Sequence, residues 1–245
     1  MKKLFLICLL CSNAFATTQY VYNVTKDEVV IDYASELVRP IASVTKLMTA
    51  IVVIESHASM TEKIPYKGFL GTAARSRGEL LSVMLVKSDN QAAEALAKSY
   101  YGGRVGFINA MNYKAKEIGM SHTTYEDPSG IGHENQSTAR DLTILLQYAY
   151  GYDTMREIAS TQSFSVVEPS KKKNKNRVIL VNNTNIRLLH DFKEIEISKT
   201  GFTNSAGKCL VMYLTKNGER YTIVILGEKN TQSVQKVGRN IIEKL

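Results

Sequence analysis

One apolar segment decides the fold: Pro40-Ile41-Ala42-Ser43-Val44-Thr45-Lys46-Leu47-Met48-Thr49-Ala50-Ile51-Val52-Val53-Ile54. Proline disfavours helix in the residue before it and is tolerated in a first helical turn. A helix is therefore predicted to begin between Pro40 and Ser43 and to run to about His57. Its side chains from Leu47 to Ile54 leave no polar face, and a helix that is apolar all round is normally enclosed by protein. We expect a buried, central helix.

The first turn of this helix carries Ser43 and Lys46, whose i, i+3 spacing places them on one face. An amine beside a hydroxyl at the positive end of a helix can take its proton, and free backbone N–H groups there can stabilise an oxyanion. S-x-x-K occurs four times, starting at Ser43, Ser170, Ser205 and Ser233, where average composition predicts roughly one match by chance. Only Ser43 opens a long apolar helix. The alternative is a serine near a helix start with a solvated lysine.

Residues 1–16 have the pattern of a secretory signal, with a basic start, an apolar run and a small-x-small end (AFA). The segment is too short to span a membrane. We therefore predict an exported, periplasmic protein that begins at Thr17. That mature chain keeps Cys209 alone, so no intrachain disulfide is possible and a hydrophobic core must hold it together. Cys209 falls in a predicted strand and is expected to be a small core residue.

The charge is basic: 31 lysines and arginines against 23 acidic residues give +8. Without Lys2 and Lys3 the balance is 29 against 23, or +6. This excess favours solubility or a peripheral electrostatic contact with an anionic envelope surface. The basic run from Lys171 to Arg177 is most simply a solvated hairpin tip, with such a contact as its functional alternative. No aromatic-rich basic motif points to a nucleic-acid partner.

Hydrophobic patterning predicts a strand pair, a block of helices, and then strands with a closing helix. The predicted strands are residues 20–24, 29–33, 162–167, 178–181, 195–199, 209–215 and 221–226. The predicted helices beyond the central one are residues 79–86, 90–101, 105–118, 137 or 138 to 150, and 231–245, and residues 59–78 are expected to be mostly loop. This order implies a mixed α/β (α+β) fold in which the first strands pair with the last. The expected parts are a sheet lobe (17–57 and 160–245) and an inserted all-helical lobe (58–159).

Two further tripeptides fall at element ends. Ser88-Asp89-Asn90 lies between two predicted helices, and Lys199-Thr200-Gly201 ends a predicted strand. Each alone would most often be a helix cap or a strand end with a turn. Each occurs once, and all three motifs in this order are a coincidence on the order of one in a thousand.

S-x-x-K, S-D-N and K-T-G together are the signature of class A β-lactamases and penicillin-binding proteins. Residues 40–50 (PIASVTKLMTA), 137–142 (STARDL) and 199–210 (KTGFTNSAGKCL) resemble the low-molecular-mass penicillin-binding proteins. Among these, the D-alanyl-D-alanine endopeptidases are the most similar, because K-T-G-F-T-N is followed there by A-G-x-C-L. The resemblance covers nearly the whole mature chain. It implies a β-lactamase/transpeptidase-like fold: an antiparallel sheet flanked by helices, with an all-helical lobe and the site in the cleft between them.

The resemblance also implies roles. Ser43 would be the acylated nucleophile and Lys46 its base, kept partly neutral by burial and by the nearby Lys199 cation. Ser88 would pass a proton towards the leaving amine. The remaining roles concern substrate and oxyanion: Asn90 would hold a substrate amide, Lys199 and Thr200 would bind a carboxylate, Gly201 would let the strand approach closely, and the N–H groups of Ser43 and Phe202 would form the oxyanion hole. The reaction needs no metal or cofactor.

The leading hypothesis is a serine DD-peptidase acting on peptidoglycan peptides and acylated by β-lactams, with endopeptidase action on D-alanyl cross-links preferred. Removal of terminal D-alanine is its alternative. The preference rests on the sequence after Lys199 and on the chain's end at Leu245, where many carboxypeptidase relatives continue into a β-domain and an amphipathic anchor.

A β-lactamase is disfavoured because no E-x-x-L-N loop is found. A non-catalytic wall-binding module would not need the nucleophile and its base. The four histidines show no metal-ligand spacing, and G-x-S-x-G is absent.

Overall fold

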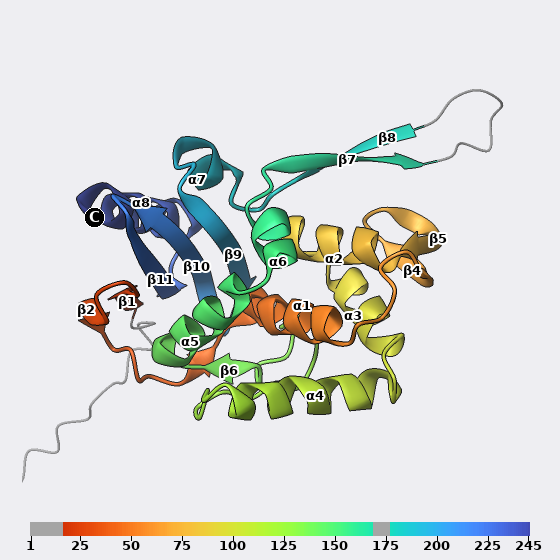
Figure 1. Ribbon diagram of the computed structural model, residues 1–245, viewed down its shortest axis with the longest axis horizontal. Helices are drawn as coiled ribbons and strands as arrows, with labels where there is room; N and C mark the ends of the chain where they lie inside the picture. The colour runs from red at the N-terminus through yellow and green to blue at the C-terminus, as the bar shows by residue number, and fades with distance from the viewer. Residues whose placement is uncertain (1–16, 169–176) are drawn as a thin grey trace, which may run out of the picture.

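A five-stranded antiparallel sheet with the order β2-β1-β11-β10-β9 forms one side of the molecule (Figure 1). The structure, a computed structural model, describes residues 17–168 and 177–245. The strands of this sheet are β1 (Thr18–Asn23), β2 (Glu28–Tyr33), β9 (Ile195–Thr203), β10 (Gly207–Lys216) and β11 (Glu219–Glu228). β1 pairs with β11 from Thr18 opposite Leu226 to Asn23 opposite Tyr221. The prediction that the first strands pair with the last is confirmed.

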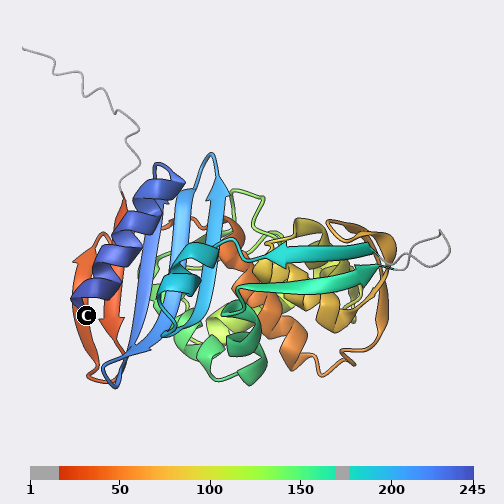
Figure 2. The same ribbon diagram turned by 90° about the horizontal axis from the view of Figure 1, so that it is seen from above.

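Helices cover both faces of this sheet. The helices are η1 (Ala42–Thr45, a 3₁₀ turn), α1 (Lys46–Glu55), α2 (Arg77–Val86), α3 (Asn90–Lys98), α4 (Gly103–Glu117), α5 (Ala139–Tyr150), α6 (Asp153–Ala159), α7 (Ile186–Asp191) and α8 (Thr231–Lys244). Figure 2 shows α8 lying across one face of β10 and β11, where Val234 and Ile241 pack with Leu210 and Ile223. α5 packs against the opposite face. Side chains of β10 and β11 are therefore buried on both faces, which explains their nearly continuous apolar sequences.

The central segment is buried as predicted, but it begins differently. Leu47 to Val53 are buried without exception. The predicted single helix is instead the 3₁₀ turn η1 followed by α1, which ends at Glu55 rather than near His57. Ala42, the first residue of this turn and just before Ser43, has a positive φ of 48°, which an α-helix does not allow. Ser43 therefore lies in η1, and Lys46 is the first residue of α1.

The part of the chain expected to be all-helical also contains a β-hairpin. β4 (Lys63–Gly68) pairs with β5 (Gly71–Ser76) within the segment predicted to be mostly loop. The contacts that fix its turn are not local: the Phe69 N–H donates to Asp89 in the S-D-N motif, 2.9 Å away. The short strands β3 (Arg39–Pro40) and β6 (Gln136–Ser137) pair with each other, and α6 and α7 were not predicted.

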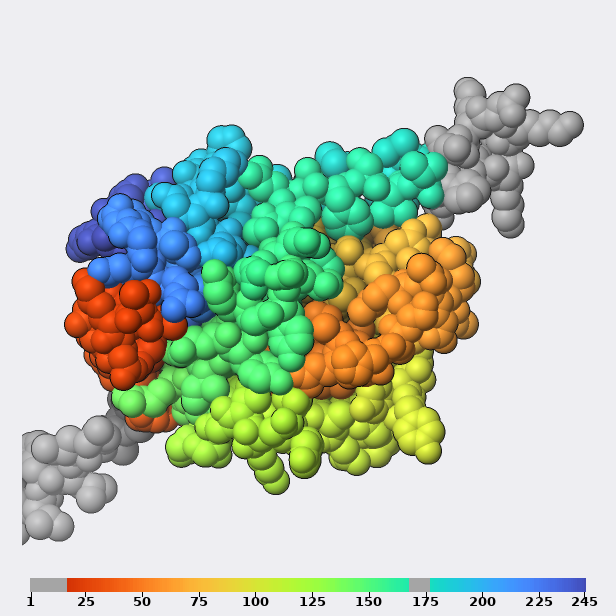
Figure 3. Space-filling view, in the orientation of Figure 1, coloured from red at the N-terminus to blue at the C-terminus, as the bar shows by residue number. Residues whose placement is uncertain are grey.

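A separate hairpin, β7 (Ser163–Glu168) with β8 (Arg177–Asn182), extends over α2 (Figures 1 and 2). The basic run predicted to form its tip lies outside the described residues, except for Arg177. The proposed signal, residues 1–16, also lies outside them. Figure 3 shows the first and last strands together at one end of the molecule and the segments around β4 and β5 at the other. Within the described residues, no helix is both long and apolar enough to cross a membrane.

Candidate active site

The edge strand β9 packs directly against the turn that carries Ser43. A Cβ placed on Gly201 would lie 3.0 Å from the Ser43 nitrogen and 3.1 Å from the Ile41 oxygen. Such approaches are tighter than side chains normally make, so glycine is required for this contact. Gly201 is therefore the point at which the strand lies against η1, in keeping with the expected close approach. K-T-G does not end the strand, however, because β9 continues to Thr203.

The amine of Lys46 joins three elements. Its Nζ donates to Ser43 Oγ (2.8 Å), to Asn90 Oδ1 (2.7 Å) and to the Ser129 carbonyl (2.5 Å). The side chain is completely buried. Burial lowers the pKa of Lys46 to about 7, against the attraction of the Asp127 and Asp89 carboxylates, which raises it. A large fraction of Lys46 is therefore neutral near neutral pH and able to accept the Ser43 proton.

The second buried amine, Lys199, lies beside Ser88. Its Nζ donates to Ser88 Oγ (2.9 Å) and to the Thr200 carbonyl (2.8 Å). Ser88 has a φ of 66°, a left-handed conformation uncommon for a serine and often found where a functional side chain is held in place. Asp89, the middle residue of S-D-N, is the N-cap of α3 and accepts from the Tyr66 hydroxyl. The motif thus brings one serine to Lys199 and one asparagine to Lys46.

The two buried amines influence each other. The sequence expectation is that a charged Lys199 lowers the pKa of Lys46. Burial, together with the positive charge of Lys46, holds the pKa of Lys199 well below its usual value. The Asp127 and Asp89 carboxylates, which the sequence interpretation did not consider, raise the pKa of Lys46 against the effect of burial. Two buried like charges repel each other, so the arrangement disfavours protonation of both amines at once.

A cavity of about 310 Å³ lies over these groups. Its lining includes the predicted Ser43, Ser88, Thr200, Gly201 and Phe202, together with Thr184, Lys208, Cys209, Thr231, Val234 and Gln235. The predicted Lys46, Asn90 and Lys199 are not in the lining. Lys46 donates to Ser43, Lys199 donates to Ser88, and Asn90 accepts from Lys46. The structure therefore brings all the sequence-predicted site residues together.

The rim residues of the cavity include some that the sequence interpretation missed. The Thr200 hydroxyl donates to the Thr184 hydroxyl (2.6 Å), and Phe202 is 52% exposed with the Lys208 amine 3.9 Å from its ring centroid. Thr184 precedes α7, which the sequence pattern did not predict, so no local signal could have placed it here. Cys209, predicted to be a core residue, is 1% exposed.

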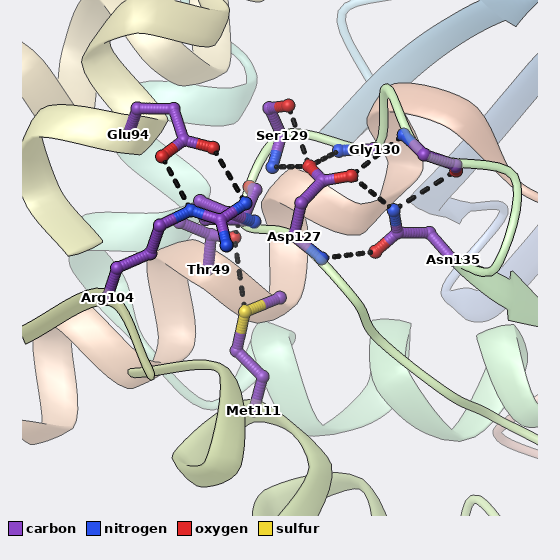
Figure 4. Close-up of polar contacts among 10 residues, drawn as sticks. Thr49, Glu94, Arg104, Met111, Asp127, Ser129, Gly130 and Asn135 are labelled. Atoms are coloured by element: carbon purple, nitrogen blue, oxygen red, sulfur yellow. Dashed lines mark hydrogen bonds and ion pairs between the residues drawn. The ribbon is translucent and has the colours of Figure 1, made fainter. Parts of the chain in front are cut away.

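Figure 4 shows the loop that supports the Lys46 amine. The Asp127 carboxylate accepts from Ser129 N (2.6 Å), Ser129 Oγ (2.7 Å), Gly130 N (2.7 Å), Gly132 N (2.8 Å) and Asn135 Nδ2 (2.6 Å). These donors lower the pKa of Asp127 to about 2. The sequence Asp127-Pro128-Ser129-Gly130 is typical of a turn, which by itself gives no role for it. Its role is to aim the Ser129 carbonyl at Lys46.

Gly130 seats this loop against η1. It has a φ of 79°, and a Cβ there would lie 1.9 Å from the Ala42 oxygen. Across the same contact, the Thr49 hydroxyl of α1 donates to the Pro128 carbonyl (2.6 Å). The loop and the central helix are therefore fixed relative to each other on both sides of Lys46. Within residues 17–168 and 177–245, no group of three His, Cys, Asp or Glu side chains is placed to hold a metal ion.

An antiparallel sheet whose edge strand meets a serine held by a buried lysine, with these three motifs, is the arrangement shared by penicillin-binding proteins and class A β-lactamases. A family model described as D-alanyl-D-alanine carboxypeptidase (peptidase S11) matches residues 60–230. The chain belongs to this family and is a serine DD-peptidase.

Curated relatives support the assignment. The chain is 35% identical over 218 residues to a D-alanyl-D-alanine endopeptidase of Escherichia coli, covering 84% of this chain and 69% of that protein. It is 38% identical over 203 residues to a D-alanyl-D-alanine endopeptidase of Pseudomonas aeruginosa, covering 78% of this chain and 64% of the relative. The chain thus spans about two thirds of the length of these two relatives.

Solved structures show the same fold. The Streptomyces K15 DD-transpeptidase superposes with a TM-score of 0.84 at 26% identity, covering 94% of this chain and 96% of that one. Penicillin-binding protein D2 of Listeria monocytogenes in its ampicillin-bound form superposes with a TM-score of 0.81 at 27% identity, covering 99% and 98%. The predicted antiparallel, β-lactamase/transpeptidase-like fold is confirmed.

Proposed function

We propose that the protein hydrolyses D-alanyl cross-links between peptidoglycan peptides through an acyl-enzyme on Ser43. The observation that carries the proposal is the 2.8 Å hydrogen bond between Ser43 Oγ and the buried Lys46 amine, at a cavity bounded by the K-T-G strand edge. Ser43 Oγ attacks the D-alanyl carbonyl, its proton passes to neutral Lys46, and the amine of the second peptide leaves. Water then attacks the ester and releases the D-alanyl acid and free Ser43.

Substrate binding would determine which lysine of the Lys46–Lys199 pair is protonated. A carboxylate held by Lys199 and Thr200 favours protonated Lys199, because an opposite charge stabilises the charged amine. Repulsion from that charge then favours neutral Lys46, the form that can act as base. Lys46 is thus most effective as a base when a carboxylate-bearing substrate occupies the site, which would limit acylation by other carbonyl compounds.

The other predicted roles fit this arrangement as proposals. Ser88, which accepts from Lys199, would relay a proton to the leaving amine. Asn90 donates no hydrogen bond among the described contacts of its side chain, so its amide N–H₂ is available for a substrate carbonyl, while its Oδ1 holds Lys46. The backbone N–H groups of Ser43 and Phe202 would stabilise the oxyanion.

Endopeptidase action is preferred to release of terminal D-alanine. Two observations support this preference: the Escherichia coli and Pseudomonas aeruginosa relatives are named D-alanyl-D-alanine endopeptidases, and residues 199–210 resemble the endopeptidase sequences. Purified residues 17–245 incubated with a cross-linked peptide dimer should yield monomers, and Ser43→Ala should yield none. Release of terminal D-alanine from dimers that stay intact would assign carboxypeptidase action instead.

We propose that β-lactams acylate Ser43 and are released slowly. The ampicillin-bound form of the Listeria relative supports acylation, and the lack of an E-x-x-L-N sequence supports a long-lived adduct. Mass spectrometry after incubation with penicillin should show a penicilloyl group on Ser43. This adduct should last for a time in which a β-lactamase would complete many turnovers. Rapid loss of the adduct with accumulation of penicilloic acid would make the protein a β-lactamase.

Export to the periplasm with removal of residues 1–16 is a further proposal, supported by the signal pattern alone. The lobe boundaries are likewise a proposal from the sequence alone. So is a peripheral contact of the Lys171 to Arg177 run with an anionic surface. N-terminal sequencing of the protein from a periplasmic fraction should begin at Thr17. Retention of Met1 in a cytoplasmic fraction would contradict export.

A further inference from the structure

A second, larger cavity of about 560 Å³ lies between α7 and α8. Its lining comprises Gln162, Ile186, Arg187, Leu188, His190, Asp191, Gln232, Gln235, Lys236 and Arg239. Gln235 lines this cavity and the catalytic cavity alike. Two walls also continue from one to the other: the segment from Thr184 to Arg187, and α8 from Thr231 to Arg239. The second cavity is therefore an extension of the catalytic cavity on the side of Thr200.

The charges of this extension are unbalanced. Asp191 is its one carboxylate, and it already accepts from Arg239 and from His190. Arg187 and Lys236 are exposed and make no ion pair with any residue of the described chain. Two cations thus face the cavity without a counter-charge, a distribution that attracts an anionic ligand.

The residue between the two cavities has a free acceptor. Gln235 Nε2 donates to Asn185 Oδ1 (2.6 Å), and Asn185 Nδ2 donates to Ser198 Oγ of β9 (2.6 Å), so the Gln235 amide is held in place. Its Oε1 is buried and has no hydrogen-bond partner in the described chain. A buried acceptor without a partner is costly.

We infer that the α7–α8 cavity binds the leaving strand of the cross-link, an acidic peptide that continues beyond the scissile bond. The inference rests on the proposed function and names the part of the substrate that the extension takes. With the carboxylate next to the scissile bond at Lys199 and Thr200, the rest of that strand would pass Gln235 and place its further carboxylates near Arg187 and Lys236. A carboxypeptidase substrate loses a single D-alanine and would leave this extension empty. The extension therefore selects cross-linked substrate.

The test compares two substrates on the mature protein: a cross-linked dimer with an acidic leaving strand, and a single stem peptide ending in D-alanyl-D-alanine. The quantity is the ratio of kcat/KM for the dimer to kcat/KM for the single peptide. The variants are Arg187→Glu/Lys236→Glu and the milder Arg187→Gln/Lys236→Gln. The matched control, Lys116→Glu/Lys244→Glu, makes the same charge change at exposed lysines of α4 and α8 that line neither cavity.

We expect the ratio to fall roughly tenfold for the double glutamate variant at low salt, less for the glutamine variant, and not at all for the control. The decrease should shrink as salt screens the charges. If the ratio stays unchanged, including the case in which both substrates lose kcat/KM equally, the inference is overturned and the endopeptidase proposal remains intact. If the wild-type protein processes the single peptide but leaves the dimer uncut, the endopeptidase proposal fails, and this inference fails with it.

Discussion

The carboxylate of Asp127 acts on the catalytic amine by two routes. It positions the Ser129 carbonyl that accepts from Lys46, and its charge raises the pKa of Lys46 against the effect of burial. Asp127→Asn removes the charge and keeps an acceptor oxygen. Because the pKa of Lys46 should then fall below about 7, neutral base is available at lower pH. The acid limb of penicillin acylation should therefore move to lower pH.

The measurement is the second-order rate of Ser43 acylation by penicillin between about pH 5 and pH 9, alongside thermal unfolding. Asp153→Asn, a change at an exposed residue of α6, is the control and should keep the wild-type profile. A purely structural role for Asp127 would lower the rate at every pH without moving the limb. A limb at the wild-type position or above it would refute the electrostatic route.

At the scale of single residues, the sequence was sufficient to predict which motif side chains lie together in the site. Ser43 and Lys46 are adjacent because their i, i+3 spacing fixes the local geometry, and Lys199 reaches Ser88 from a separate motif across the fold. The charges that act on Lys46 were not predictable, since they include that of Asp127, which only the folded chain brings near.

Among the elements, β9 and η1 make a contact on which acylation of Ser43 should depend. Gly201→Ala places a methyl 3.0 Å from the Ser43 nitrogen and 3.1 Å from the Ala42 Cβ, so the strand or the turn must shift by a few tenths of an ångström. Small displacements of reacting groups are costly, and we expect acylation roughly 10- to 100-fold slower. Stopped-flow or gel-based acylation with a fluorescent penicillin measures it.

A comparable methyl elsewhere tests whether the effect belongs to this contact. Gly78→Ala in α2 meets the Met60 oxygen at 3.5 Å and the Met60 Cβ at 3.8 Å, which are ordinary contacts, and this variant should be acylated at the wild-type rate. Wild-type acylation by Gly201→Ala would show that the strand edge tolerates a side chain there, contrary to the close packing described.

The β4–β5 hairpin should depend on one hydroxyl. Tyr66 OH donates to Asp89 Oδ2 (2.5 Å) and accepts from Leu70 N (3.1 Å), and both groups are buried. Tyr66→Phe leaves the buried carboxylate and the N–H without this partner, which should cost about 1–3 kcal/mol of the free energy of unfolding. Denaturant titration gives the value. Tyr113→Phe, at a 69% exposed tyrosine of α4, should change nothing measurable.

The same hairpin shows why some elements escaped the sequence. Strong periodicity placed the strands around Lys216 to Glu219 and the helix capped by Thr138, because those signals are local. Residues 63–76 carry no such pattern, and their turn is held by Asp89 from another element. The 3₁₀ turn η1 was predicted as the start of an α-helix, because no local sequence signal indicates the positive φ of Ala42.

For the whole molecule, the sheet and the helices of the expected helical lobe share one core. The larger buried cluster contains Val211 and Val224 of the sheet, Met48 of α1, and Leu80 and Phe107 of the helical part, so it runs across the expected lobe boundary. A core that is continuous in this way favours unfolding in one cooperative transition rather than lobe by lobe. The interface between the lobes is also where the site lies, so cooperative folding would keep Ser43 and Lys199 aligned.

Cys209, the one cysteine after residue 16, reports on this transition from inside the sheet. It is 1% exposed, and burial raises the pKa of its thiol to about 11, so the native protein should not react with a thiol reagent at pH 8. With rising denaturant, labelling of Cys209 should become fast at the midpoint where far-UV circular dichroism reports loss of the helices. Cys209→Ala/Ser205→Cys, with its thiol in an exposed turn, should react without denaturant. Labelling of Cys209 well below the helical midpoint would mean that the sheet opens first and that the shared core does not couple the lobes.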